Sequence, residues 1–103
     1  MIIVWENIAQ EQLEEVANYI ENGFGLKYVR LFQQDVLHTT ELLLLNPYLG
    51  ALEPLLSGRS KEYRSILANR LDKMVYYVDE NTIHIVAFWD CRREPGGQTK
   101  HLV

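Results

Sequence analysis

Apolar positions in the first half of the chain follow a helical period, after a short apolar run at the start. Residues 2–5 (IIVW) are apolar and β-branched or aromatic, which predicts a strand. From residue 8 the apolar positions recur at helical spacing, with Asn7 as the expected N-cap and Gln10 three residues later. The Asn-Gly pair and second glycine of residues 22–25 are expected to end this helix.

A second helix is predicted for residues 26–45. Its expected apolar stripe is Val29, Phe32, Val36, Thr40 and Leu43. It should end at Asn46-Pro47, because proline disfavours helical backbone in the residue before it. The short loop between two amphipathic helices predicts an antiparallel helical hairpin.

The second half of the chain changes to strand-like patterns. Residues 62–68, 73–78 (KMVYYV) and 82–89 (TIHIVAFW) are predicted strands, with a hairpin turn at 79–81. The last strand is apolar on both faces and should lie inside the sheet. Prolines and glycines mark an irregular connection before these strands: Pro47, Gly50, Pro54 and Gly58.

The element order is therefore β-α-α-β-β-β. Helices followed by strands indicate an α+β fold, with the hairpin packed on one face of a mainly antiparallel sheet. The other sheet face is expected to be partly open and to carry basic residues. We expect one domain over residues 1–103, with the hairpin at 8–45, the sheet at 62–89 and a polar tail at 90–103.

Size and composition are those of a folded single domain. The chain has 103 residues, of which 48% are hydrophobic and 23% charged. It has one cysteine, Cys91, which excludes an internal disulfide and a multi-cysteine metal site. It lacks a secretory signal and any run of 18 apolar residues, so a cytoplasmic protein without membrane contact is expected. No metal-ligand cluster or glycine-rich phosphate loop is present, and we expect no cofactor.

The net charge of -4 hides an asymmetry. Residues 1–58 carry eight acidic and two basic side chains, a net charge of -6, whereas residues 59–103 carry a net +2. Such a division is typical of separate electrostatic surfaces within one protein. The alternative is a solvated acidic helix face beside a mixed surface.

Motifs along nearly the whole chain resemble the RelE/ParE superfamily, the toxin halves of toxin–antitoxin pairs. The resemblance covers residues 2–95 and follows the order of the elements. Its pieces are the opening strand, Ala9 and Leu13, Tyr19-Ile20, Phe32, Leu45-Asn46-Pro47, Glu62-Tyr63-Arg64, the strand Lys73 to Val78, and Asp90-Cys91-Arg92-Arg93-Glu94-Pro95.

The resemblance implies one of two activities. ParE-like members have a long helical hairpin, as predicted here, and poison DNA gyrase. RelE-like and YoeB-like members cut mRNA on the ribosome with basic residues and a C-terminal Tyr or His. Arg64, Lys73 and Arg92 stand where such nucleases place basic residues, and Glu53 matches the carboxylate of their E-P-L segment. The C-terminal Tyr or His is absent, since the comparable stretch reads Arg93-Glu94-Pro95.

These residues have a structural alternative beside the catalytic one. RNA cleavage needs a base for the 2′-OH, cations for the phosphate and an acid for the leaving oxygen. Three cations converging on one phosphate would supply part of this. The alternative pairs them with Glu62, Asp72 and Asp90 as surface ion pairs, worth about 0–1 kcal/mol each. Glu53 lies in a proline-flanked loop, where an exposed carboxylate is ordinary.

Other candidates are weaker. His84 lies within a strand and is expected to be a hydrogen-bonded sheet residue, and His38 and His101 have no identified partner. Cys91 has no activating neighbour in the sequence and is expected to be a half-buried thiol. Tyr77 shares a predicted face with Lys73 and Val75 and, with Arg93, is the candidate for contacting a target. Trp5, Tyr76, Phe88 and Trp89 are expected to be core residues.

We therefore expect a toxin held inactive by a cognate antitoxin, whose helix or strand would lie in the groove between hairpin and sheet. The long hairpin, the absent C-terminal Tyr or His and a pI of about 5.3 favour DNA gyrase as the target. The alternatives are a ribosome-dependent mRNA endonuclease and a non-toxic member that only binds partners. A homodimer and a hetero-oligomer with the antitoxin are both compatible with the family.

Overall fold

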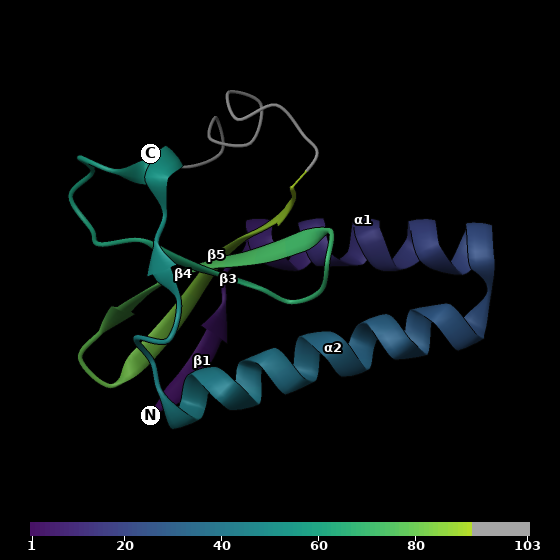
Figure 1. Ribbon diagram of the computed structural model, residues 1–103, viewed down its shortest axis with the longest axis horizontal. Coiled ribbons are helices and arrows are strands. Elements are labelled where there is room, and N and C mark those ends of the chain that lie inside the picture. Colours follow the sequence, from purple (N-terminus) through teal and green to yellow (C-terminus); the bar gives the residue numbers. More distant parts are fainter. Residues whose placement is uncertain (92–103) are drawn as a thin grey trace.

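A pair of long antiparallel helices lies across one face of a five-stranded sheet, as Figure 1 shows. The structure is a computed structural model that describes residues 1–91. The α+β prediction is confirmed, with two short elements added in the connection. In chain order the elements are β1 (Ile2–Trp5), α1 (Asn7–Phe24), α2 (Leu26–Leu45), β2 (Ala51–Leu52), the 3-10 turn η1 (Pro54–Leu56), β3 (Arg64–Leu67), β4 (Asp72–Asp79) and β5 (Thr82–Asp90).

The turn of the helical hairpin depends on one glycine. α1 continues through Asn22 and Gly23 and ends at Phe24, later than the sequence predicted. Gly25 has a φ of +94°, which side chains with a Cβ atom rarely adopt. Because this residue reverses the chain, α2 begins at Leu26, directly after it.

The cap predicted at the start of α1 is wrong. Asn7 is the first helical residue, and Glu6 before it makes no side-chain capping hydrogen bond. Gln10 instead reaches back, and its Nε2 donates to the carbonyl oxygen of Trp5 at 2.9 Å. This amide therefore ties the first turn of α1 to the end of β1.

The buried stripe of α2 differs from the prediction at one position. Thr39 is 3% exposed, whereas Thr40 is only half-buried. The Thr39 hydroxyl donates to the carbonyl oxygen of Asp35 at 2.9 Å, which satisfies its polar atom inside the helix. Both threonines fit a helical period after Val36, so the orientation of the helix on the sheet decides which is buried.

The sheet order is β1-β5-β4-β3-β2, so β5 is an interior strand, as predicted. β1 runs parallel to β5, with Ile3 beside Ile83, and the other neighbours are antiparallel. The sequence did not predict β2, because two residues carry no periodic signal. β2 pairs with β3 and forms the far edge of the sheet.

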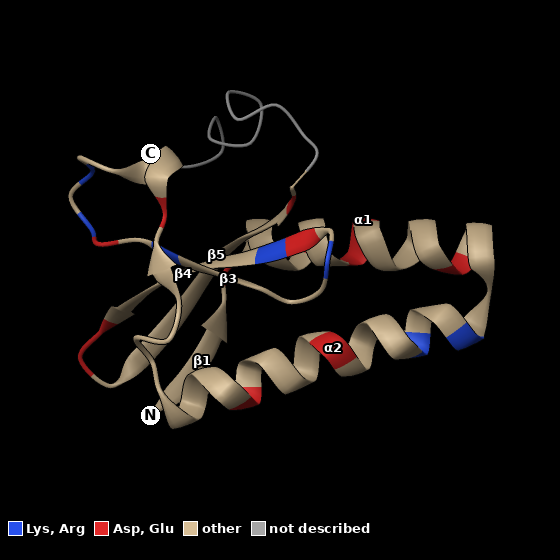
Figure 2. Cartoon of the chain, viewed as in Figure 1, with Lys and Arg blue, Asp and Glu red and all other residues tan. Residues whose placement is uncertain are grey.

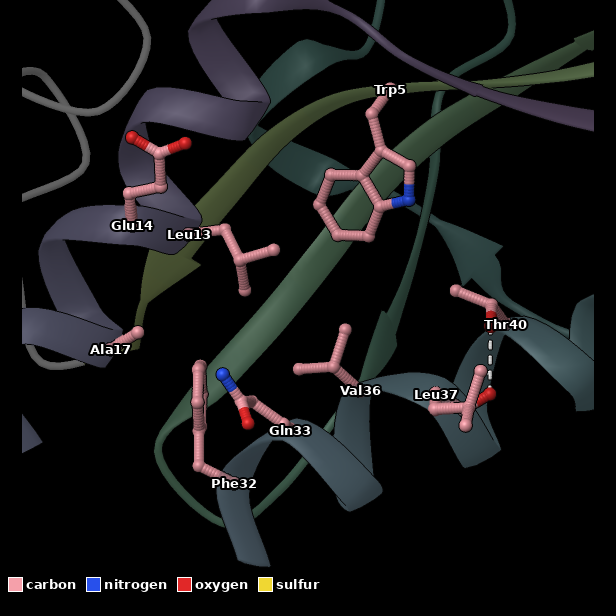
Figure 3. A pocket seen from close by; sticks show the side chains of 9 residues that line it. All are labelled: Trp5, Leu13, Glu14, Ala17, Phe32, Gln33, Val36, Leu37 and Thr40. Carbon is pink, nitrogen blue, oxygen red and sulfur yellow. Dashed lines mark hydrogen bonds between the residues drawn. The ribbon is translucent and has the colours of Figure 1, made fainter. Parts of the chain in front are cut away.

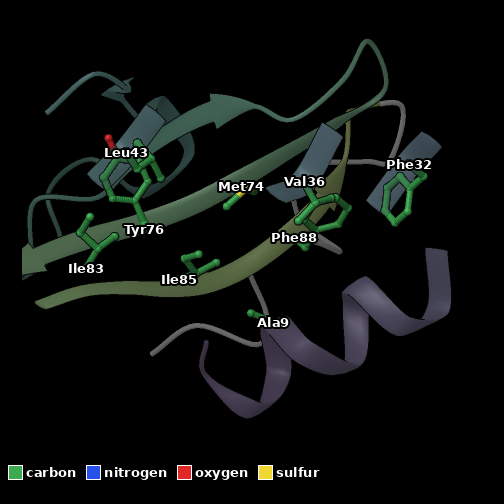
Figure 4. Close-up of a cluster of buried hydrophobic side chains, with 9 residues drawn as sticks. All are labelled: Ala9, Phe32, Val36, Leu43, Met74, Tyr76, Ile83, Ile85 and Phe88. Carbon is green, nitrogen blue, oxygen red and sulfur yellow. The ribbon is translucent and has the colours of Figure 1, made fainter. Parts of the chain in front are cut away.

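A bulge in β5 sets which side chains face the hairpin. Val75 of β4 pairs with Ala87 and Tyr76 pairs with Ile85, so Val86 is an extra residue. Beyond the bulge, the alternation of β5 side chains between the two sheet faces is shifted by one residue. The helix-face cluster (Figure 4) consists of Ala9, Phe32, Val36, Leu43, Met74, Tyr76, Ile83, Ile85 and Phe88.

The opposite sheet face carries a second apolar cluster. This open-face cluster consists of Leu56, Tyr63, Val75, Val86, Ala87 and Trp89. Leu56 and Tyr63 come from the connection between α2 and β3, so that connection covers part of the face expected to be open. Tyr76, Phe88 and Trp89 are buried core residues, as predicted. None of the helices in residues 1–91 is long and apolar enough to span a bilayer.

Gly50 generates the first testable prediction. A Cβ atom at Gly50 would lie 2.7 Å from the Ser65 carbonyl oxygen and 2.8 Å from the Tyr76 hydroxyl. We expect Gly50→Ala to lower the free energy of unfolding by about 1–3 kcal/mol, because the core must shift. Urea denaturation measures this.

Gly23 is the matched control. A Cβ atom at this helical glycine would meet no atom within 4 Å. Gly23→Ala should therefore stabilise the protein by about 0.4–1 kcal/mol. Equal stability of the Gly50→Ala variant and the wild type would contradict the close contact at Gly50.

Candidate functional site

Glu53 is buried, not exposed as its loop position predicted. Its side chain has no solvent-exposed area. The Glu53 backbone N–H donates to the carbonyl oxygen of Tyr63 at 2.9 Å, and its Oε2 accepts from the Leu55 N–H at 2.9 Å. The carboxylate thus caps the turn that Pro54 begins, while its Oε1 forms an ion pair with the Nζ of Lys73.

Lys73 joins this loop to the sheet. It comes from β4, and its Nζ lies 5.5 Å from the ring centroid of Trp89 on β5. The Lys73 side chain is 20% exposed, so most of it is buried but water still reaches part of it. Lys73 therefore pairs with the buried Glu53, a partner that the surface ion pairs considered from the sequence did not include.

The Glu53 carboxyl is ionised in this arrangement. Burial alone would raise its pKa, because a charge loses solvation inside the protein. Hydrogen bonds from Lys73, the Leu55 amide and Ser65, together with the Lys73 charge, outweigh burial and bring the pKa of Glu53 below 4.5. The sequence did not indicate Ser65 as a hydrogen-bond partner of Glu53. Ser65 lies on β3, which pairs with the strand β4 that carries Lys73.

Arg64 does not converge with Lys73. It lies directly opposite Tyr76 in the β3–β4 pair, and opposed residues share a sheet face. Tyr76 belongs to the helix-face cluster, whereas Lys73 lies with Trp89 on the other face. The expected grouping of these two cations around one phosphate is therefore wrong for the described residues. Arg92 and Arg93, the other basic candidates, lie outside the described residues.

The Arg64 guanidinium has local partners. It donates to the Gly50 carbonyl oxygen at 2.9 Å and to the Glu62 carboxylate at 2.7 Å. Its central carbon lies 5.2 Å from the ring centroid of Tyr48. These contacts fasten the start of β3 to the segment after α2, and the pair with Glu62 is the surface ion pair considered from the sequence.

Tyr77 lies on the open face with Lys73 and Val75, as predicted. Its ring stacks on the His84 imidazole with 4.6 Å between centroids and 14° between planes. The Nζ of Lys61 lies 4.6 Å from the Tyr77 centroid, and His84 Nδ1 lies 3.1 Å from Glu6 Oε1. We call Glu6, Lys61, Tyr77 and His84 the open-face patch.

In the open-face patch, the neutral phenol of Tyr77 lies between the side chains of Lys61 and His84. Burial, followed by the charges of Glu6 and Asp79, raises the pKa of Tyr77, so its hydroxyl remains a hydrogen-bond donor at neutral pH. His84 is a hydrogen-bonded sheet residue, as expected. Lys61 was not a candidate from the sequence, because its distance from Tyr77 along the chain hides their contact.

The remaining candidates offer no activated group. Cys91 is exposed, so the half-buried position expected for it is wrong. Although the residue is exposed overall, partial desolvation of its thiol raises the pKa of Cys91, and the opposing effect of the Lys73 charge is smaller, which disfavours the thiolate. His38 is exposed on α2, and His101 lies outside the described residues. Within residues 1–91 no three His, Cys, Asp or Glu side chains are placed to hold a metal ion.

A groove opens between the two helices, at the border of hairpin and sheet where an antitoxin segment was expected. This hairpin groove encloses about 320 Å³ and is drawn in Figure 3. Trp5 lies at its end nearest the sheet, and Leu13 and Val36 point into it from the facing helices. Its wall is apolar apart from a few polar groups such as Glu14.

The fold and this arrangement agree with a known family. The sequence profile described as "ParE toxin of type II toxin-antitoxin system, parDE" matches residues 3–95. The chain belongs to this ParE toxin family. The match extends from within β1 to beyond the end of β5, so the resemblance drawn from the sequence motifs is confirmed.

Two solved structures share the fold of this ParE-family chain. One belongs to the chromosomal ParDE TA system from P. aeruginosa, with a TM-score of 0.70 and 19% identity over 87% of this chain and 95% of that one. The other is the YoeB dimer from Staphylococcus aureus, with a TM-score of 0.59 and 22% identity over 84% and 92%. No curated protein sequence matches the chain.

The Glu53–Lys73 pair makes the stability of this ParE-family chain depend on pH. The folded-state pKa of Glu53 is below its ordinary value of 4.5, so the stabilisation is present above that value and is lost as the pH falls through the folded-state pKa. We expect Glu53→Gln to lower the free energy of unfolding at neutral pH by about 1–3 kcal/mol. The difference in the free energy of unfolding between Glu53→Gln and the wild type should decrease as the pH falls. Urea denaturation at several pH values measures this difference.

Glu62→Gln is the control for this prediction. The Glu62 side chain is 64% exposed in its pair with Arg64. Its substitution should change stability by less than about 1 kcal/mol. A Glu53→Gln deficit that stays constant from neutral pH to about pH 3 would contradict the lowered pKa.

Proposed function

We propose that this chain is a toxin that acts on DNA gyrase in the manner of ParE and is neutralised by a cognate antitoxin. The proposal implies a cytoplasmic protein, since gyrase acts there. It rests chiefly on one observation, the buried Glu53–Lys73 ion pair. Glu53 and Lys73 are the two described residues that best match the base and the cation of a nuclease, and they are bound to each other.

The argument against RNA cleavage follows from access and charge. A general base must come within hydrogen-bond reach of the 2′-OH, and the Glu53 side chain has no exposed area. Its negative charge is compensated by Lys73, which reduces the positive charge available to a phosphate. Arg64 is directed to the other sheet face and bonded to Gly50 and Glu62. These contacts support a toxin that works by binding a protein.

The nuclease remains the second candidate because of one specific feature. Glu53 is ionised and lies beside a cation, which is the pairing that a base and a phosphate-holding lysine would need. An opening of the loop around Pro54 would expose both groups together. In this alternative, Arg92 and Arg93 are predicted from the sequence to supply the further positive charges at the phosphate.

Gyrase and ribosome assays separate the two candidates. We expect the purified protein to inhibit DNA supercoiling by gyrase and to leave mRNA on translating ribosomes uncut in primer extension. Lys73→Arg should retain the inhibition, because it keeps the charge beside Glu53.

Codon-specific cuts that disappear in Lys73→Ala or Arg92→Ala would overturn the gyrase assignment. Expression without growth arrest, together with retained antitoxin binding, would instead identify a non-toxic member of the family. Co-expression with the antitoxin encoded beside the gene should restore growth if the protein is a toxin.

Tyr77 is the described candidate for contacting the target, and Arg93 is the second. We expect Tyr77→Ala to weaken gyrase inhibition on the order of tenfold or more, as for an aromatic anchor of an interface. Tyr48→Ala is the control, since Tyr48 is 59% exposed and, like the half-buried Tyr77, lies beside a basic side chain, here Arg64. Unchanged inhibition by a folded Tyr77→Ala protein would contradict this role.

A further inference from the structure

The outer end of the helical hairpin exposes a row of aromatic rings. Tyr19, Phe24 and Tyr28 are 68%, 61% and 52% exposed. The Phe24 ring is the middle one, 6.4 Å from the Tyr19 ring and 6.2 Å from the Tyr28 ring between centroids, and it meets both edge-on. Figure 1 shows that the hairpin extends beyond the sheet, so no described strand packs against its outer turns. Because the rings hold one another in place, a partner that covers them loses little entropy in ordering them.

Two leucines extend the row into a continuous apolar patch. Leu31 of α2 and Leu71 of the loop between β3 and β4 line one depression of about 470 Å³ together with Phe24 and Tyr28. Both leucines are close to half exposed. We call Tyr19, Phe24, Tyr28, Leu31 and Leu71 the tip patch. Contiguous exposed apolar surface of this kind marks an interaction site.

The outer half of the hairpin is electrically balanced, unlike the rest of the first 58 residues. Residues 15–34 carry two acids, Glu15 and Glu21, and two bases, Lys27 and Arg30, so their net charge is zero. The net -6 of the first 58 residues therefore comes from other parts of the chain. Figure 2 shows the basic residues of α2 at its outer end. Two copies of this end can approach each other without the repulsion that two acidic surfaces would cause.

Opposite charges flank the tip patch on its two sides. Glu15 is exposed one helical turn before Tyr19 on α1, and the two side chains line the same cavity. Lys27 is exposed on α2, and its Nζ lies 5.9 Å from the centroid of the Tyr28 ring. A carboxylate therefore lies beside the α1 end of the aromatic row, and an ammonium group lies beside the α2 end.

We propose that the tip patch is a dimer interface between two copies of this chain, related by a two-fold axis near Phe24. Such an axis brings the same patch of both copies together and places the α1 flank of one against the α2 flank of the other. Glu15 of each copy then faces Lys27 of the other, which gives two ion pairs. The sequence left a homodimer open as one possibility, and the tip patch gives it a location that does not depend on the proposed function.

The size of the tip patch predicts a weak dimer. A ring of this kind buries about 150–250 Å² when fully covered, so the exposed parts of the three rings amount to about 300–450 Å². With the two leucines added, two such patches would bury on the order of 1,000 Å², the size range of weak and transient contacts. We therefore expect a reversible dimer with a Kd on the order of 10–100 μM.

Sedimentation equilibrium of the purified full chain tests this interface, at protein concentrations from about 1 to 300 μM. The wild type should show a monomer–dimer equilibrium, and Phe24→Ala should weaken it more than about tenfold. Leu45→Ala is the matched control, because Leu45 is 84% exposed at the other end of α2. Its substitution should change the dimer Kd by less than about twofold. Thermal unfolding of each variant confirms that it is folded.

A charge exchange makes the test specific. Glu15→Lys and Lys27→Glu should each weaken self-association about tenfold, because each variant turns both ion pairs into repulsions. An equimolar mixture of these two variants should form a heterodimer of about wild-type affinity, since every pair between them again joins opposite charges. Glu14→Lys is the control, because Glu14 lines the hairpin groove instead. It should leave the dimer unchanged.

Four results would overturn the inference. The first is a wild-type chain that stays monomeric up to about 300 μM. The second is a loss of self-association in Leu45→Ala but not in Phe24→Ala, which would place the interface at the other end of α2. The third is a mixture of the charge variants that does not recover.

The fourth result concerns the antitoxin. A Phe24→Ala chain that self-associates like the wild type but binds the antitoxin more weakly would make the antitoxin the occupant of the tip patch. All four results leave the proposed action on gyrase untouched, because inhibition of supercoiling is measured separately.

Discussion

The rest of the structure depends on the double burial of β5. This strand pairs with β1 on one side and β4 on the other, and both of its faces are covered. The bulge at Val86 makes this compatible with its sequence, because it returns Phe88 to the hairpin side and directs Trp89 to the open side. The hairpin, the loop before β3 and the ion pair beside Trp89 are all positioned against this strand.

The Glu53–Lys73 pair gives a structural role to two residues that the sequence suggested as candidates for catalysis. A carboxylate next to a lysine on a sheet face has the groups that an acid–base site would need. The same two groups here also hold the loop around Glu53 against the open-face cluster. Here the carboxylate has no exposed area and makes its hydrogen bonds within the protein. Breaking such a pair would leave a charge buried without compensation, which costs free energy. The loop that carries Glu53 and the sheet that carries Lys73 therefore stabilise each other.

The charge distribution acquires meaning only on the folded surface. Most carboxylates of the acidic first half lie on the two helices, where Glu14 lines the hairpin groove. Glu6 belongs to the open-face patch, and Glu53 is buried beside Lys73. Two basic residues of the second half have partners within the fold, Lys73 with Glu53 and Arg64 with Gly50 and Glu62. Arg59, Lys61 and Arg70 are exposed.

The sequence by itself determined the two helices, four of the five strands, the interior position of β5, the face of Tyr77 and the family, because these follow from local periodicity and motif order. The tertiary structure decided which polar groups meet. Glu53 lies twenty residues from Lys73 along the chain, and only loop closure buries it. Arg64 is separated from Lys73 by strand register, in which a shift of one residue exchanges the two faces. Long-range pairing of this kind leaves no periodic trace, so the candidate site could be assembled only in three dimensions.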